Sequence, residues 1–217
     1  MNNFYKRVLT SIVLILLLII GFFNNLVWLL LLTVISLISF FEFKTLIDNI
    51  WKENFLKKLI INLSFVFYLI LFAYFLYISN RKDVIIILSV CIFSDIGGYV
   101  CGKLIGGKKL TKISPNKTIS GSIGSFVFCL FPIIYYFYYY KYLLNIEFNY
   151  LIICFVFILI SVICQLGDLF ISYFKRRSNV KDTGSILPGH GGLLDRLDGI
   201  IFAVPFGLFI YNIIYWL

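Results

Sequence analysis

Residues 150–198 read YLIICFVFILISVICQLGDLFISYFKRRSNVKDTGSILPGHGGLLDRLD. An apolar segment at 150–174 comes first, and a polar segment at 172–198 follows it. The polar segment gathers cations, carboxylates and the only histidine of the chain: Lys175, Arg176, Arg177, Lys181, Arg196, Asp182, Asp195, Asp198 and His190. Because about 17–25 apolar residues cross a bilayer as a helix, this stretch predicts a membrane helix that leads into a charged, glycine-rich loop.

The composition of the whole chain agrees with a membrane setting. Of the 217 residues, 61% are hydrophobic and 13% are charged. Soluble domains carry about 25% charged residues, so a soluble globular protein is excluded as the fold class. The net charge of +9 comes from basic residues in loops that are predicted to lie at one membrane face, so no nucleic-acid partner is predicted. We therefore predict an all-α, polytopic integral membrane protein.

Seven apolar segments have the length of membrane spans. They lie at about 8–23, 26–43, 59–78, 84–102, 119–140, 150–174 and 199–217. The first has no small-residue cleavage site after it, so it is predicted to be a retained helix and not a signal peptide. We divide the chain into an N-terminal membrane region at 1–83, with about three spans, and a second membrane region at 84–217, with about four, which contains the candidate functional residues.

The basic residues predict the orientation of these spans. With the N-terminus in the cytoplasm, sixteen of the 19 Lys and Arg residues fall in cytoplasmic segments. Only Arg81, Lys82 and Lys141 fall on the other side. The positive-inside rule therefore favours a cytoplasmic N-terminus and two cytoplasmic polar loops. Placement in a bacterial cytoplasmic membrane is a further expectation.

The five cysteines indicate packing and not chemistry. They lie singly within the apolar spans, with no CxxC pair: Cys91, Cys101, Cys129, Cys154 and Cys164. An odd number of isolated cysteines does not fit a disulfide framework or a zinc site, and a free cysteine behaves as a small hydrophobic residue.

A first polar stretch lies at 94–121 and reads SDIGGYVCGKLIGGKKLTKISPNKTISG. Asp95 lies within an apolar span, where an ionisable residue is costly and is a candidate for function. Gly97, Gly98 and Gly102 fit either close helix packing or close approach of a ligand to the backbone.

Thr118 or Ser120, further along the same stretch, is expected to cap a new helix whose free N–H groups suit a phosphate. Most lysines here fit simple cytoplasmic anchoring, with Lys117 as the exception beside the turn.

The second polar stretch offers carboxylates for a metal. Asp168 lies near the end of its span, and Lys175 lies two turns further along the same face if the helix continues. Asp195 and Asp198 are three residues apart and share a helix face. Carboxylates at a membrane boundary suit Mg²⁺, although salt bridges with the neighbouring cations are an alternative explanation. His190 is flanked by glycines and fits a substrate contact better than a general base, which phosphoryl transfer does not require.

The segment 172–198 resembles the signature of the CDP-diacylglycerol synthase family, also called phosphatidate cytidylyltransferases. That signature has the form S-x-x-K-R-x4-K-D-x-G/S-x2-L-P-G-H-G-G-x-x-D-R-x-D. The first polar stretch and Gly167-Asp168-Leu169 are similar to further blocks of the family, so the resemblance covers about 84–217. A long signature of mixed residue types is far more specific than a short glycine motif.

The resemblance implies that CTP and phosphatidic acid in the bilayer react to CDP-diacylglycerol and pyrophosphate, with Mg²⁺ and a monovalent cation such as K⁺ as cofactors. It implies three groups of site residues. Metal ligands would be Asp168, Asp195, Asp198 and Asp95, the first two being the strongest candidates. Catalytic residues would be Lys175, Arg196 and His190. Substrate-binding residues would be Lys117, Ser114, Arg176, Lys181, Gly191 and Gly192. A homodimer is a further expectation.

Two positions depart from the family pattern. The family usually has glutamate where this chain has Ser120 and Ile171. A non-catalytic homologue that acts as a lipid-binding membrane scaffold is therefore the alternative function. A transporter fits less well, because the charges lie in loops at one face and not along a pore. The aspartate motif of CDP-alcohol phosphotransferases is not found in the sequence.

Overall fold

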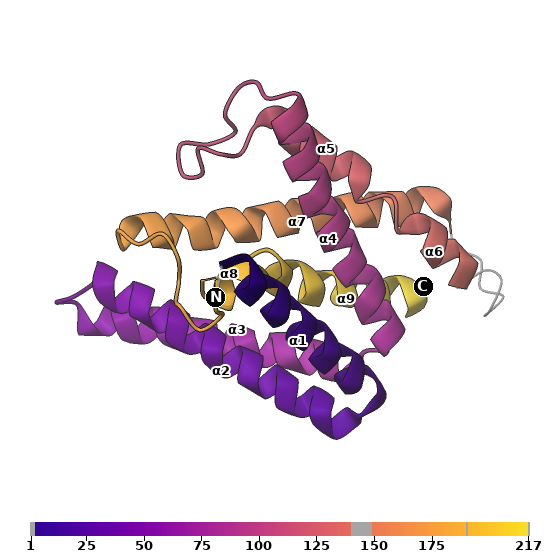
Figure 1. The fold of residues 1–217 in the computed structure, drawn as a ribbon. Helices are drawn as coiled ribbons and strands as arrows, with labels where there is room; N and C mark the ends of the chain where they lie inside the picture. Colours follow the sequence, from indigo (N-terminus) through magenta and orange to yellow (C-terminus); the bar gives the residue numbers. More distant parts are fainter. Residues whose placement is uncertain (1–2, 140–148, 190, 217) are drawn as a thin grey trace. The chain divides into compact units, whose positions relative to one another are not determined.

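The computed structural model describes residues 3–139, 149–189 and 191–216, which are helical apart from turns, loops and two isolated bridges (Figure 1). The helices are α1 (Asn3–Phe23), α2 (Asn25–Ile50), α3 (Phe55–Ile78), α4 (Arg81–Leu104), α5 (Ile119–Phe128), α6 (Ile133–Phe137), α7 (Tyr150–Arg177), α8 (Leu194–Leu197) and α9 (Ile200–Trp216). The all-α prediction is thus confirmed for the described residues.

Five helical segments are long and apolar enough to cross a membrane. They are α2, α3, α4, the segment Ile119–Phe137 that joins α5 and α6, and α7. Two shorter apolar helices, Ile12–Phe23 and Ile200–Ile213, lie near the ends of the described chain. The structure therefore supports a polytopic membrane protein, while the count of seven spans stays a prediction.

The expected span at 119–140 is present as an apolar segment long enough to cross a membrane, Ile119–Phe137, but its helix is interrupted. A turn at residues 129–132 separates α5 from α6, and residue 140 lies outside the described part of the chain. Pro132 precedes α6 directly. Proline has no backbone N–H to continue a helix and its ring clashes with the preceding turn, so the interruption at this position has a local cause.

The chain divides into two compact units, which we call unit 1 and unit 2. Unit 1 comprises 1–78 and 173–198, and unit 2 comprises 79–172 and 199–217. The long helix α7 passes from one unit into the other, and the predicted division at residue 83 stays a functional prediction.

Unit 1 is built around α2, which packs against α1, α3 and α8. Asn24 begins α2 because its side-chain oxygen accepts hydrogen bonds from the N–H groups of Leu26 and Val27, as expected of an N-cap. The first two helices are therefore joined by a tight turn at this single residue. Further along α2, Phe43 stacks on Phe65 of α3 with ring centroids 4.0 Å apart. The α2–α3 pair is therefore joined through a buried aromatic core.

Unit 2 is centred on the contact between α4 and α5, which approach each other closely through small residues. A Cβ atom added at Gly97 would lie 2.5 Å from the backbone oxygen of Gly124 and from Cβ of Phe128. A Cβ added at Gly98 would lie 2.7 Å from the Ser125 hydroxyl. These glycines therefore serve helix packing, one of the two alternatives that the sequence left open.

Candidate functional site

A polar cavity of about 360 Å³ lies in unit 2 and is lined by α4, the loop after it, the start of α5 and α7. We call it the polar cavity. Four residues predicted to belong to the site line it: Asp95, Ser114, Lys117 and Asp168. Two of these come from helices and two from the loop at 105–118, so the tertiary structure gathers residues that are as far apart in the sequence as Asp95 and Asp168.

Asp168 is held between two partners in this cavity. Lys117 forms an ion pair with Asp168 Oδ2. Ser172, one turn along α7, donates a hydrogen bond to Asp168 Oδ1 over 3.2 Å. The side chains of Lys117 and Asp168 keep 27% and 30% of their surface exposed, so both remain accessible to a bound molecule.

The loop that carries Lys117 is anchored by backbone hydrogen bonds. Leu110 N donates to Lys117 O over 2.8 Å, and Ile119 N donates to Lys108 O over 3.0 Å. Thr118 then caps α5, since its hydroxyl accepts from Gly121 N, which confirms one of the two predicted caps. The loop is thereby fixed beside α5, and Lys117 projects from an ordered turn.

Ser120, one of the two departures from the family pattern, has a local role. Its hydroxyl donates to the carbonyl of Gly106 and lies 3.0 Å from the Thr118 hydroxyl. The other departure, Ile171, is fully buried in unit 2. Neither position adds a carboxylate to the polar cavity.

A row of uncharged polar side chains, two of which line the polar cavity, was missed by the sequence analysis. Ser122 of α5 donates to Gln165 Oε1 of α7. The Gln165 amide donates to Ser161 over 3.4 Å, and the Ser161 hydroxyl lies 2.7 Å from that of Ser94 on α4. The signal was a glutamine and paired serines within apolar spans, where polar side chains commonly bond between helices.

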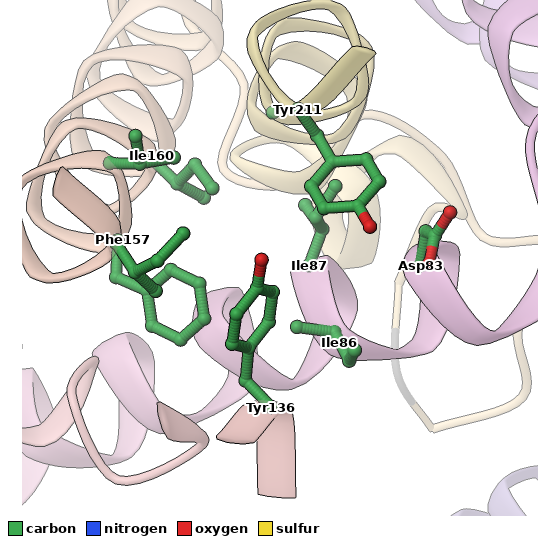
Figure 2. A pocket seen from close by; sticks show the side chains of 10 residues that line it. Asp83, Ile86, Ile87, Tyr136, Phe157, Ile160 and Tyr211 are labelled. Atoms are coloured by element: carbon green, nitrogen blue, oxygen red, sulfur yellow. The ribbon is translucent and has the colours of Figure 1, made fainter. Parts of the chain in front are cut away.

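A second, much smaller cavity in unit 2 lies between α4, α6, α7 and α9 (Figure 2). Figure 2 shows the side chains of Tyr136, Tyr211 and Asp83 around it, together with apolar residues of the neighbouring helices. Its volume is about 20 Å³. A cavity of this size holds about one water molecule, so it is too small for a nucleotide or a lipid.

Unit 1 contains the other described residues that were predicted for the site, on the last turn of α7, on the loop at 178–193, on α8 and directly after it. Asp195 organises this region. Its Oδ1 lies 2.9 Å from the Lys175 ammonium, and its Oδ2 accepts hydrogen bonds from the N–H groups of Thr183 and Gly192 over 2.8 and 3.0 Å. The Lys175 and Asp195 side chains are 13% and 8% exposed, so this is a largely buried ion pair. The helix does continue through Lys175, as its spacing from Asp168 required.

Glu42 of α2 is a second organising carboxylate in unit 1, and the sequence analysis missed it. It is 4% exposed, and it accepts hydrogen bonds from the Thr183 hydroxyl over 2.7 Å and from the N–H groups of Leu193 and Leu194 over 2.9 and 2.8 Å. The signal was present, because the rule that singled out Asp95 as an ionisable residue in an apolar span applies equally to Glu42.

The remaining predicted residues are distributed as follows. Arg176, Lys181 and Arg196 are exposed. Gly191 adopts φ 85°, a conformation that favours glycine, and its carbonyl accepts from Leu187 N. Asp198 directly follows α8, which is a single turn, so the shared helix face expected for Asp195 and Asp198 rests on one turn alone. His190 lies outside the described residues. The substrate-binding and catalytic roles of these residues stay predictions.

The carboxylates of the candidate site fit a metal ion that is bound partly by the protein and partly by the phosphates of a substrate. Among the described residues of each unit, no three His, Cys, Asp or Glu side chains form a cluster able to hold a metal alone. Mg²⁺ commonly uses one or two carboxylates together with substrate phosphates and water. Asp95 and Asp168 at the polar cavity match that pattern. Asp195 already accepts three interactions, of roughly four that a carboxylate can accept, so it has room for one further bond.

Comparison with known proteins agrees with the family resemblance of the sequence. The model of the cytidylyltransferase family matches residues 63–214. Similar curated proteins include the phosphatidate cytidylyltransferases of Staphylococcus haemolyticus (strain JCSC1435), 46% identical over 114 residues, and of Bacillus subtilis (strain 168), 36% identical over 156 residues. That of Rickettsia bellii (strain RML369-C) is 46% identical over 132 residues.

The aligned parts cover 52%, 69% and 58% of this chain and 42%, 56% and 54% of the respective relatives. The chain thus spans about half the length of the curated relatives it matches. The family match nevertheless extends over most of the chain and includes the polar cavity and the loop at 178–193, so the chain belongs to the cytidylyltransferase family.

Proposed function

We propose that this protein is a phosphatidate cytidylyltransferase, which makes CDP-diacylglycerol and pyrophosphate from CTP and phosphatidic acid. The observation that carries the proposal is the polar cavity, where Asp95, Lys117 and Asp168 meet between apolar helices. Such a cavity suits a charged headgroup whose acyl chains remain in lipid. The relatives named above carry this activity in their names, and the signature at 172–198 supports the same reaction.

The proposed reaction is a substitution at phosphorus. An oxygen of the lipid phosphate attacks the α-phosphorus of CTP, the bond from that phosphorus to the oxygen bridging the β-phosphate breaks, and pyrophosphate leaves. Catalysis of this kind depends on positioning and on neutralising charge. Lys117 is proposed to neutralise phosphate at the polar cavity. Lys175, Lys181 and Arg196 are proposed to do so around the loop at 178–193, with Arg176, Ser114, Gly191 and Gly192 completing the substrate contacts.

Asp95, Asp168, Asp195 and Asp198 are proposed to hold Mg²⁺, with Asp168 and Asp195 as its principal ligands. When bound, Mg²⁺ supplies charge stabilisation for the phosphoryl oxygens. Asp168 belongs to unit 2 and Asp195 to unit 1, so joint ligation is a proposal that rests on the family resemblance. K⁺ as a second cation and a homodimeric assembly are proposals of the same kind.

The assay that tests this function uses purified protein in mixed micelles with phosphatidic acid, labelled CTP and Mg²⁺. We expect labelled CDP-diacylglycerol to form with Mg²⁺ and not in the presence of a chelator. Phosphatidic acid binding without any turnover would instead support the alternative function, a lipid-binding membrane scaffold. That alternative is suggested by Ser120 and Ile171, which stand where the family usually has glutamate.

Seven spans with a cytoplasmic N-terminus are proposed for the membrane arrangement, in a bacterial cytoplasmic membrane. The support is the distribution of basic residues, which places both polar loops where CTP is available.

To test the arrangement, single cysteines are placed at Asn179 and Asn145 in a cysteine-free variant and labelled with an impermeant thiol reagent on intact spheroplasts. We expect labelling at position 145, which lies outside the described residues, and none at position 179 until the membrane is opened. The reverse pattern would refute the orientation.

A further inference from the structure

Glu42 is a buried carboxylate that the proposed reaction does not use. It belongs to α2 and lies outside residues 63–214, the part of the chain that matches the family model. All three of its described hydrogen-bond partners are donors, and they belong to the loop at 178–193 and to the start of α8. A buried polar group of this kind fixes the position of the groups that it bonds.

The short helix α8 explains why an outside carboxylate is needed. Its N-cap residue is Leu193, whose side chain provides no cap hydrogen bond. The first N–H groups of a helix have no partner within the helix. Glu42 accepts from Leu193 N and Leu194 N and so supplies the cap that the local sequence lacks.

The loop is shaped to receive this carboxylate. A Cβ atom added at Gly184 would lie 2.7 Å from Glu42 Oε1, and one added at Gly192 would lie 2.5 Å from Glu42 Oε2. Real Cβ atoms essentially never approach other atoms this closely, so side chains at both positions would displace Glu42 or the loop. Gly192, the second glycine of the GG pair in PGHGG, is therefore required because Glu42 occupies the space of any side chain at this position.

The loop also links Glu42 to Asp195. Thr183 donates from its hydroxyl to Glu42 and from its N–H to Asp195, over 2.7 and 2.8 Å. Gly192 adjoins Glu42 and donates its N–H to Asp195 over 3.0 Å. Asp195 in turn pairs with Lys175. Two carboxylates, Glu42 of α2 and Asp195 of α8, thus both accept hydrogen bonds from the loop.

We propose that Glu42 is a positioning residue, which holds the loop at 178–193 and the Asp195–Lys175 pair in the arrangement required for substrate. Its catalytic consequence rests on the proposed function, whereas its effect on the order of the loop does not. Both oxygens of Glu42 must accept, because Oε2 serves the Thr183 hydroxyl and Leu194 N, and Oε1 serves Leu193 N. A glutamine has one accepting oxygen and turns its amide towards at least one N–H group.

The test compares Glu42→Gln with Asp48→Asn in purified full-length protein. Asp48 lies on the same helix, its carboxylate pairs with Lys58, and 43% of its side chain is exposed, so the control removes the same charge without touching the loop. The first measurement is limited trypsin digestion, followed as cleavage after Lys181, which is exposed in the loop. We expect Glu42→Gln to raise this cleavage rate about tenfold or more, as for loss of one hydrogen bond to a charged group, and Asp48→Asn to leave it unchanged.

The second measurement is kcat and KM for CTP, including a double-mutant cycle with Thr183→Val. We expect kcat/KM to fall about tenfold in Glu42→Gln, Thr183→Ser to retain most activity, and Thr183→Val to add little in the Glu42→Gln background, because both changes break the same contact. A residue that only supported the insertion of α2 would lower the yield or the thermal stability and would not couple to Thr183 in kcat/KM.

The outcomes separate this inference from the proposed function. Equal cleavage in Glu42→Gln and Asp48→Asn would overturn it, as would faster cleavage with unchanged turnover in an active enzyme. If the wild-type protein makes no CDP-diacylglycerol while Glu42→Gln still loosens the loop, the positioning role stands and the proposed activity fails.

Discussion

Asp168→Asn is expected to lower kcat/KM for CTP by about 10²-fold or more. The side chain lines the polar cavity and is proposed to hold Mg²⁺, and a metal supplies several kcal/mol of charge stabilisation to a phosphoryl transfer. Asparagine keeps the shape of the side chain but not its charge. Initial rates measured over a range of Mg²⁺ concentrations should show a raised Mg²⁺ requirement in the variant.

Lys117→Met is the matched comparison, because it breaks the same ion pair from the other side. If Asp168 served only to pair with Lys117, both variants would have the same kinetics. We expect instead that Lys117→Met raises KM for CTP and leaves the Mg²⁺ requirement near that of the wild type. Near-normal turnover of Asp168→Asn at saturating Mg²⁺ would remove Asp168 from the metal site.

Lys175→Met is expected to have the second large effect. Lys175 pairs with Asp195, and both side chains are largely buried. Removing one partner of a buried pair leaves an uncompensated charge and costs about 3–5 kcal/mol. We therefore expect the loop that Asp195 organises to open, seen as rapid trypsin cleavage after Lys181, and CTP turnover to fall by about two orders of magnitude.

Lys52→Met provides the control for Lys175→Met. Lys52 is an exposed lysine in the turn between α2 and α3, so this change removes one positive charge without leaving a buried carboxylate unpaired. We expect the control to keep wild-type digestion and turnover. If Lys175→Met also kept both, the pair would be no more than an incidental contact.

Much of the fold was predictable from the sequence because membrane helices follow a local rule. A run of apolar residues long enough to cross the bilayer must satisfy its backbone hydrogen bonds within itself, and only a helix does so with a single segment. What hydropathy did not predict is the break before α6 at Pro132, which lies within a long apolar run.

The candidate site was predictable in its residue types and less so in its contacts. The motif residues Lys117 and Asp168 were identified singly, and the structure pairs them at one cavity. Asp195 was predicted as a metal ligand, and the structure shows in addition that it accepts two backbone hydrogen bonds and a lysine. Such contacts depend on how a loop closes, which residue spacing does not specify.

The sequence by itself therefore determined the helical membrane class and the residue types of the phosphate and metal chemistry, because hydropathy and motif spacing are properties of short segments. Only the tertiary structure decided that Glu42 caps α8 and meets Thr183, residues 141 positions apart in the chain. The physical reason is that a buried carboxylate must find donors wherever the fold provides them, and those donors are backbone N–H groups that every residue except proline carries. No sequence pattern distinguishes the N–H groups of Leu193 and Leu194 from any others until the loop brings them to α2.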